Sequence, residues 1–352
     1  MKSIHIAASR EYDVLIETGL LSQLGTLAAR QLPGRRAALI SDDAVFPLYG
    51  QQAEQSLQDA GFQTEHFIFP HGEQHKTLAT YGRALNFLCD RRFTREDVII
   101  ALGGGVVGDL AGFTAATYQR GITYIQVPTT LLSMMDSSVG GKTAVDLPEG
   151  KNLVGTFTQP HLVLCDTNVL ATLSPQVEAE GWAEIIKYGM IRSQELINFL
   201  LENTPGTDIE WVIAHCVSIK RDVVAQDEQD NAVRQVLNFG HTIGHAIERC
   251  SGYSLYHGEG VAMGMAIMTR ACVRQKKCPP ACWTVLETLL DKYHLPKTTD
   301  KSVDELLEAA HADKKRRGDA ITLIQPEVLG RCGLYSTNYD ELRRVLELGM
   351  PL

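Results

Sequence analysis

The chain has 352 residues, of which 44% are hydrophobic and 21% charged. This composition is ordinary for a globular protein and excludes a mainly disordered chain, and the length favours two domains over one. The formal net charge of −9 excludes a global positive field that would attract nucleic acid or anionic lipid, so any anionic ligand has to be bound by locally gathered cations.

The N-terminus and the hydropathy of the chain predict a cytoplasmic protein. Charged residues, Lys2 and Arg10 among them, interrupt the apolar residues of the first 17 positions, where a signal peptide would have a continuous apolar region. No apolar run approaches the roughly 18 residues of a membrane span. We therefore expect neither a membrane nor nucleic acid as a partner.

In the first half of the chain, short β-branched runs alternate with helical stretches. Such alternation predicts an α/β domain with a largely parallel sheet. The expected strands are 36–40, 65–69, 97–102, 123–127 and 161–165. Amphipathic helices are expected between them, at 51–60 and 77–89.

The pattern changes at Ser174 and Pro175, where a serine before a proline predicts the start of a helix. Helical periodicity then dominates. The expected helices include 188–202, 211–224, 241–250, 259–274, 282–293 and 303–310, and a single strand candidate lies at 321–324. We therefore predict an α/β domain at 1–173, followed by an all-helical domain at 174–352.

A glycine-rich segment follows the strand expected at 97–102. It reads GGGVVGD over residues 103–109, and glycines before a helix allow the backbone to approach a pyrophosphate closely. A tight turn that only packs a helix on a strand is an equally good interpretation of the glycines alone. The usual acid about 20 residues further on is absent. Asp42, after the strand at 36–40, is the candidate to replace it.

A second glycine segment, Gly140-Gly141-Lys142-Thr143, is similar to the end of a phosphate-binding P-loop. That pattern requires a further glycine at position 136, where this chain has Asp136. Without it the backbone amides cannot wrap a phosphate, so we exclude a nucleotide-hydrolysing P-loop.

Histidines and carboxylates indicate a metal site in the second half. His241 and His245 stand four residues apart, on one face of an expected helix. His257 follows, and Glu180 and Glu184 share a face of an earlier helix. Two histidines and a carboxylate with an open position would form a catalytic zinc site. The spacing alone fits either His245 or His257 as the completing ligand.

Cations and amides occur close to these motifs. Taken singly, each lysine is more often a solvated surface residue. Together they could receive a phosphate and a carboxylate through charge-assisted hydrogen bonds. The set consists of Lys142, Lys151, Lys187, Lys220 and Arg234, with Asn152 and Asn238 as amide donors.

Eight segments in a fixed order connect these features. They are GGGVVGD at 103–109, QVPTTL at 126–131, DSSVGGKT at 136–143, GKNL at 150–153, AEIIKYG at 183–189, NFGHTIGHAIE at 238–248, HGE at 257–259 and DKK at 313–315. In order and interval they resemble the 3-dehydroquinate synthase family of sugar-phosphate cyclases over nearly the whole chain. The resemblance implies a Rossmann-like NAD-binding domain, a helical metal-binding domain and a homodimer.

The resemblance also implies cofactor contacts. Zinc or cobalt would be held by Glu184, His241 and His257, with His245 facing the substrate. At position 71 this chain has His71 where the family commonly has an acid. The implied NAD contacts are Asp42, Glu73, Lys76, Gly105, Val106, Val107, Gly108, Asp109, Thr129, Thr130, Lys142 and Lys151.

For the substrate, the resemblance implies a pocket of cations and amides. One lysine of the pair Lys314 and Lys315 would join it, and Arg120 would come from the partner subunit. Lys187 and His245 are the candidates for handling phosphate and protons. The implied residues are Arg120, Asp136, Lys142, Asn152, Lys187, Lys220, Arg234, Asn238 and His245.

The implied activity is that of a carbon–oxygen lyase of the shikimate pathway, which makes aromatic amino acids. It converts 3-deoxy-D-arabino-heptulosonate 7-phosphate to 3-dehydroquinate by oxidation with NAD, phosphate elimination, re-reduction, ring opening and aldol closure. A cyclase of neutral sugar phosphates, a metal-dependent polyol dehydrogenase and an inactive scaffold are the alternatives. Lys220 with Arg234 suits a carboxylate, and intact Glu184 and the histidines argue against a scaffold.

Overall fold

The computed structural model describes residues 1–30, 36–252, 254–311 and 320–351. Contacts within the chain define two compact units: the first is Met1–Leu173 with Lys220–Gln229, and the second is Ser174–Ile219 with Asp230–Leu352. The return of Lys220–Gln229 to the first unit is not foreseen by the sequence. The two predicted domains, with separate binding roles, stay predictions.

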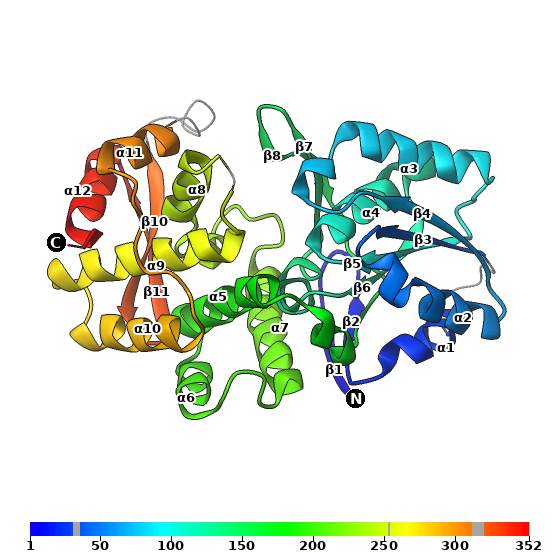
Figure 1. Ribbon diagram of the computed structural model, residues 1–352, viewed down its shortest axis with the longest axis horizontal. Coiled ribbons are helices and arrows are strands. Elements are labelled where there is room, and N and C mark those ends of the chain that lie inside the picture. Colours follow the sequence, from blue (N-terminus) through cyan, green and yellow to red (C-terminus); the bar gives the residue numbers. More distant parts are fainter. Residues whose placement is uncertain (31–35, 253, 312–319, 352) are drawn as a thin grey trace. The chain divides into compact units, whose positions relative to one another are not determined.

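A seven-stranded sheet forms the middle of the first unit (Figure 1), in the order β1-β2-β9-β6-β5-β3-β4. All neighbours are parallel except β1 and β2, which confirms a largely parallel sheet. The strands are β1 (Lys2–Ile6), β2 (Tyr12–Ile16), β3 (Arg36–Asp42), β4 (Gln63–Phe69), β5 (Val98–Gly103), β6 (Thr123–Pro128) and β9 (Leu162–Cys165). The five predicted strands are β3, β4, β5, β6 and β9.

Both faces of this sheet are covered by helices. Leu39 and Ile100 belong to the core on the side of α1 (Leu24–Ala29) and α2 (Gln51–Asp59). The next residue of each strand, Ile40 and Ala101, belongs to the core with α3 (Leu78–Asp90) and α4 (Gly105–Thr117). Because both faces are buried, these strands are continuous apolar runs rather than alternating ones, and each buried Leu or Ile stabilises the fold by about 1.5–3 kcal/mol.

The order of the sheet contains a switch point between β3 and β5. From β3 the chain goes outward to β4, whereas from β5 it goes through α4 to β6 on the opposite side. In doubly wound sheets, ligands bind outside the carboxyl ends of the strands that flank such a point. Those ends are Asp42 in β3 and Gly103 in β5.

A hairpin formed by β7 (Lys142–Leu147) and β8 (Gly150–Phe157) packs against α4. It contains the end of the motif at 136–143 and the whole of the motif at 150–153, where no strands were predicted. At Gly155 an added Cβ would lie 2.1 Å from the carbonyl oxygen of Thr143. The two strands therefore approach each other closely because one of them has a glycine there.

The second unit is built around α9 (His257–Arg274), which is buried on most sides. It contacts helices of the same unit on several sides, and a helix that is apolar nearly all round belongs in a core. Its neighbours include α5 (Pro175–Arg192), α8 (His241–Cys250), α10 (Pro280–Lys292) and α12 (Tyr339–Gly349). The described part of the unit also contains α6 (Gln194–Glu202), α11 (Val303–His311) and the start of α7 (Ile209–Gln226), which continues into the first unit. No helix in the described ranges is long and apolar enough to span a membrane.

Two expectations for this unit are corrected. It is not all-helical, because β10 (Ile321–Val328) pairs antiparallel with β11 (Arg331–Thr337), around Gly330 at a φ of 74°. The helix expected at 188–202 is two helices. Ser193 is extended, at a φ of −148°, and its hydroxyl accepts a hydrogen bond from the amide of Leu196, so it ends α5 and caps α6.

Candidate metal centre and dinucleotide site

Three helices of the second unit bring a carboxylate and two imidazoles together. Oε1 of Glu184, on α5, lies 3.4 Å from Nε2 of His241 on α8 and 3.5 Å from Nε2 of His257 on α9. Two ligand atoms about 2.1 Å from one tetrahedral zinc ion are about 3.4 Å apart. The three groups are therefore spaced as ligands of a single ion.

Glycines explain why these two histidines meet. A Cβ on Gly264 of α9 would lie 2.0 Å from the carbonyl oxygen of Gly240, and one on Gly244 of α8 would lie 2.8 Å from the backbone of Gly260. The helices α8 and α9 thus pack backbone to backbone. As a result, the ring centroids of His241 and His257 are 5.2 Å apart.

In His241 and His257, the ring nitrogen that faces away from Glu184, Nδ1, also has an oxygen partner. Nδ1 of His257 lies 2.9 Å from Oε1 of Glu248, and Nδ1 of His241 lies 3.2 Å from the carbonyl oxygen of Phe239. When Nδ1–H donates to these oxygens, the lone pair of each Nε2 points toward Glu184. Metal-binding histidines usually have this second hydrogen bond, which fixes the tautomer and the ring orientation.

The pKa shifts of Glu184, His241 and His257 are those expected at a site that binds a cation. Burial raises the pKa of Glu184, but Lys187 and both histidines outweigh it and hold that pKa well below its usual value. Burial lowers the pKa of His241 well below its usual value, whereas Glu184 and Glu248 outweigh burial at His257 and raise its pKa to about 10.

Glu184 also ion-pairs with Lys187, one turn further on. Among the described residues, neither Glu184 oxygen accepts a hydrogen bond of regular geometry, although both are shielded from solvent. A buried carboxylate needs a cation beside it, and its second partners here are imidazoles that can bind metal. The donor set of one carboxylate and two imidazoles therefore fits zinc or cobalt.

His245 joins the same group of histidines. Its ring lies 5.4 Å from that of His241 and 5.7 Å from that of His257, and the ligand nitrogens of all three are within 4.8 Å of one another. Unlike Glu184, His245 is exposed. The set with Glu184 has the closer contacts and the buried charge, so we retain it, and the individual roles stay predictions.

In the first unit, the glycine segment between β5 and α4 serves packing and also leaves amides available. A Cβ on Gly103 would lie 2.4 Å from Val107, and one on Gly108 would lie 2.7 Å from Gln126. No side chain caps the start of α4, and the amide of Gly108 is the first to bond back, to Gly104. The amides before it at the helix start suit the pyrophosphate of a dinucleotide.

The carboxyl ends of β3 and β6 flank this segment. Asp42 is buried, and its Oδ1 accepts hydrogen bonds from the amides of Ala44, at 3.0 Å, and Val45, at 2.8 Å. Burial raises the pKa of Asp42, and the two amides oppose that rise. After β6, the amide of Thr129 donates to the carbonyl oxygen of Gly103 at 3.0 Å. Thr130, next in the chain, adjoins Gly104.

Lys76 gathers four polar partners although its side chain is only 3% exposed. Its Nζ lies 2.9 Å from Glu73, 3.0 Å from Asp109, 3.8 Å from Asp146 and 2.8 Å from Oδ1 of Asn152. The structure thus brings three predicted NAD contacts and one predicted substrate contact into a single network. Burial raises the pKa of Asp109 to about 6, against the opposing effect of Lys76.

The other predicted residues of the first unit belong to several different elements. Lys220 contacts the carboxylate of Asp136 and donates to its carbonyl oxygen at 2.9 Å. Lys142 and Lys151 are exposed on the hairpin of β7 and β8, and Arg120 is exposed with a φ of 66°.

In the second unit, Lys187 and Arg234 are buried, and Asn238 ends a short helix (η7, Val233–Asn238) that contains Arg234. Lys314 and Lys315 lie outside the described residues.

Two residues that contact the predicted sites were missed by sequence reasoning. Asp146 accepts a hydrogen bond from the amide of Asn152 at 2.7 Å and contacts Lys76. Glu248 contacts His257. A signal for Glu248 was present, since it follows His241 by seven residues on the same helix face. Glu180, considered as a ligand, instead accepts a hydrogen bond from the amide of His257 at 3.0 Å.

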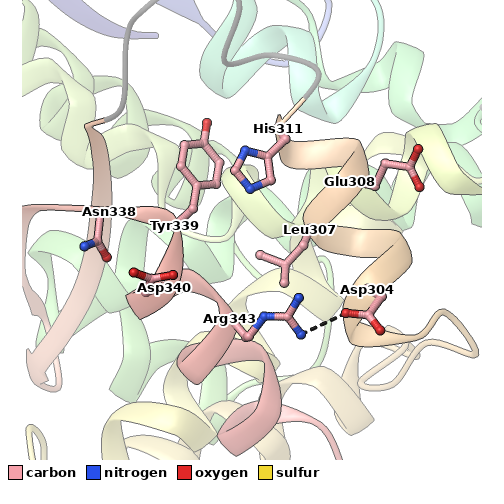
Figure 2. Close-up of a pocket in the computed structure, with 8 residues that line it drawn as sticks. All are labelled: Asp304, Leu307, Glu308, His311, Asn338, Tyr339, Asp340 and Arg343. Carbon is pink, nitrogen blue, oxygen red and sulfur yellow. Dashed lines mark hydrogen bonds and ion pairs between the residues drawn. The ribbon is translucent and has the colours of Figure 1, made fainter.

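A cavity of about 640 Å³ lies elsewhere in the second unit, between α11 and α12 (Figure 2). The ring of His311 stacks on Tyr339, and Arg343 pairs with Asp304 at 2.8 Å. The full lining is Asp304, Leu307, Glu308, His311, Asn338, Tyr339, Asp340 and Arg343. None of these is a predicted site residue, so this cavity does not mark the metal or dinucleotide site.

The doubly wound α/β unit and the mainly helical unit together have the fold of sugar-phosphate cyclases. A solved structure of 2-deoxy-scyllo-inosose synthase complexed with carbaglucose-6-phosphate, NAD+ and Co2+ matches 99% of this chain and 100% of its own, with a TM-score of 0.90 and 26% identity. A 2-epi-5-epi-valiolone synthase from Streptomyces hygroscopicus, solved with NAD+ and Zn2+, shares the fold at a TM-score of 0.87 and 24% identity, over 98% of each chain.

Within that class, the chain belongs to the 3-dehydroquinate synthase family. Residues 66–180 match the family model for the 3-dehydroquinate synthase N-terminal part, and residues 181–316 match that for the C-terminal part. A curated 3-dehydroquinate synthase from Enterococcus faecalis is 47% identical over 352 residues, which is 98% of each chain.

Proposed function

We propose that the protein converts 3-deoxy-D-arabino-heptulosonate 7-phosphate to 3-dehydroquinate and phosphate, as its family does. The observation that carries the proposal is the convergence of Glu184, His241 and His257 on one point, in a chain 47% identical to a curated 3-dehydroquinate synthase. The reaction belongs to the shikimate pathway of aromatic amino acid biosynthesis.

The cofactors are NAD and a divalent metal, zinc or cobalt. When bound, NAD accepts and returns a hydride while the metal acts as a Lewis acid on the substrate hydroxyl. In this chain, the open amides from Gly105 to Val107 suit the pyrophosphate, and Asp42 suits a ribose hydroxyl, because its carboxylate lies at the switch point. Glu184, His241 and His257 hold the metal.

The substrate has a phosphate and a carboxylate, and buried cations suit both. Lys187 and Arg234 of the second unit are 1% and 2% exposed, and charge-assisted hydrogen bonds from such groups are strong. Lys220 in the first unit is also buried and is kept beside Asp136. Lys142, Asn152, Asn238 and His245 complete the proposed contacts.

His245 and Lys187 are the proposed groups for moving protons and binding the leaving phosphate. His245 is exposed and within reach of the metal ligands, which suits a group that contacts substrate. A general acid or base must lie within hydrogen-bond reach of the proton it transfers.

We further propose a homodimer in which Arg120 reaches the active site of the partner subunit. Arg120 is exposed and adopts the left-handed backbone conformation, at a φ of 66°, which turns the chain sharply after α4. The substrate is a small molecule, and the net charge of −9 gives no support for nucleic acid as a partner.

The test is turnover of the heptulosonate phosphate with catalytic amounts of NAD and added zinc or cobalt. We expect 3-dehydroquinate by mass spectrometry, little turnover of a neutral heptulose phosphate, and loss of activity with a chelator. Glu184→Gln should lower turnover by about 100-fold or more, because it weakens a metal ligand. Glu195→Gln, an exposed glutamate on α6, is the matched control. Preferred turnover of the neutral sugar phosphate would contradict the proposed substrate.

A further inference from the structure

We infer that Glu248 is a positioning residue that aims the imidazole of His257 at the metal. This inference rests on the proposed metal site. Glu248 is 3% exposed, and its Oε1 lies 2.9 Å from Nδ1 of His257. The opposite nitrogen of the same ring lies 3.5 Å from Glu184. The ring is therefore held between two carboxylates, one on its metal-facing side and one behind it.

The backbone of His257 is fixed independently of its ring. Its amide donates to Oε1 of Glu180 at 3.0 Å, and a Cβ on Gly258 would lie 2.5 Å from the Cα of Glu180. The first turn of α9 is thus held against α5. What remains variable at His257 is the rotation of its side chain, and Glu248 is the group that contacts the ring nitrogen on the side away from Glu184.

Glu248 and His241 belong to the same helix, seven residues apart, so they lie on the same face of α8. One helix thereby supplies a metal ligand directly and orients the ligand that comes from α9. A Cβ on Gly260 would lie 3.1 Å from Cγ of Glu248, so the close packing of α8 on α9 also limits where the carboxylate can lie.

The physical effect has two parts. A carboxylate that accepts the Nδ1–H fixes the tautomer with its lone pair on Nε2, and its negative charge makes that nitrogen a stronger donor to a metal. Loss of such a partner typically weakens metal affinity about 10- to 100-fold. A glutamine at position 248 keeps an acceptor oxygen but removes the charge. It should therefore retain the orientation of the His257 ring and lose only the effect of the charge on Nε2.

The experiment measures zinc dissociation constants by competition with a chromophoric chelator, and the absorption spectrum of the cobalt-loaded protein. We expect Glu248→Ala to bind zinc about 10- to 100-fold more weakly than wild type, Glu248→Gln to be intermediate, and the cobalt spectrum of Glu248→Ala to change. Glu259→Gln is the matched control. It removes a carboxylate from the first turn of α9, the helix that carries His257, where Glu259 accepts a hydrogen bond from the amide of Tyr256 at 3.0 Å.

The outcomes separate this inference from the proposed function. Wild-type affinity in both Glu248 variants, with weakened binding in His257→Ala, would overturn the positioning role while the metal site stands. A lower melting temperature without any change in zinc affinity would also overturn it, because that is the result of a purely structural role. If wild type itself binds no zinc or cobalt, the proposed metal site fails instead. Should Glu248→Ala not fold, the nearly isosteric Glu248→Gln decides.

Discussion

At the residue scale, two buried charged side chains, Lys76 and Glu184, lie at the centres of the two candidate sites. Lys76 and Glu184 are 3% and 1% exposed, and both would be unfavourable without opposite charges close by. Lys76 has three carboxylates and an amide oxygen around it. Glu184 has Lys187 and two imidazoles. Each buried charge therefore marks a place where several groups are held in fixed positions.

Removing the Lys76 charge should destabilise the first unit. Lys76→Met leaves Glu73, Asp109 and Asp146 without their cation, and breaking a buried ion pair costs about 3–5 kcal/mol. The matched control is Lys277→Met. Lys277 pairs with Glu341 at 2.9 Å but is 37% exposed, and such pairs contribute about 0–1 kcal/mol. Urea unfolding followed by circular dichroism measures both, and equal small losses would contradict the buried network.

His71, which stands where the family commonly has an acid, forms a hydrogen bond whose effect on its pKa can be measured. Nδ1 of His71 lies 2.7 Å from Oδ1 of Asp43, whose hydrogen bond raises the pKa of His71 above its usual 6.5, while His71 lowers the pKa of Asp43. The favourable contribution of the protonated histidine is thus full below pH 6.5 and is lost as the pH rises through the folded-state pKa.

Titration of the His71 ring by NMR should therefore give a midpoint above 6.5, and Asp43→Asn should lower it. Glu54→Gln is the control, because Glu54 contacts a different histidine, His66, in the same way at 2.9 Å. An unchanged His71 midpoint in Asp43→Asn would exclude the pair in solution.

At the scale of elements, glycines set how closely helices approach. A Cβ on Gly264 would collide with the backbone of Gly240 at 2.0 Å, whereas one on Gly82, inside α3, meets nothing within 4 Å. The first glycine therefore serves the contact between α8 and α9, which brings His241 and His257 together. The second only adds flexibility to a helix.

The two glycines should respond oppositely to alanine. Gly82→Ala should stabilise the protein by about 0.5–1 kcal/mol, because alanine loses less backbone entropy in a helix. Gly264→Ala should destabilise it by about 1–3 kcal/mol through overpacking, and should weaken zinc binding by moving α8 from α9. Melting temperatures and chelator competition measure the two effects. Full zinc affinity in Gly264→Ala would contradict the close contact as the cause of the site.

Elements with strong local signals were predicted from the sequence, and those that depend on tertiary contacts were not. The apolar runs of β3, β5 and β6 and the cap at Ser174, whose hydroxyl accepts a hydrogen bond from the amide of Val177 at 3.3 Å, are local features. Ser193 was missed because apolar periodicity continues across it. The hairpin of β7 and β8 was missed because its glycines, such as Gly155, are typical of loops.

For the whole molecule, the sequence predicted the parallel sheet and a helical second half, although not the pairing of β10 with β11. It also predicted most of the residues that gather around Lys76 and Glu184, but not Asp146. It did not predict that Lys220–Gln229 returns to the first unit, because contacts between distant segments leave no local pattern. Spacing alone also left the third metal ligand open. The close contacts of Glu184 with both imidazoles favour the set that the family resemblance implies.

A single reaction with a deuterium-labelled substrate tests the central claim, which is that NAD is used and regenerated during phosphate elimination. The substrate carries deuterium at C5, because a ketone there acidifies the C6 proton whose loss expels phosphate from C7; this carbon becomes C4 of the product. Phosphate, NADH and the label in the product are followed together. We predict phosphate release with no accumulation of NADH, deuterium retained at C4 of 3-dehydroquinate, and loss of all turnover with a chelator. One NADH formed for each substrate consumed, without phosphate release, would contradict the account and identify a dehydrogenase.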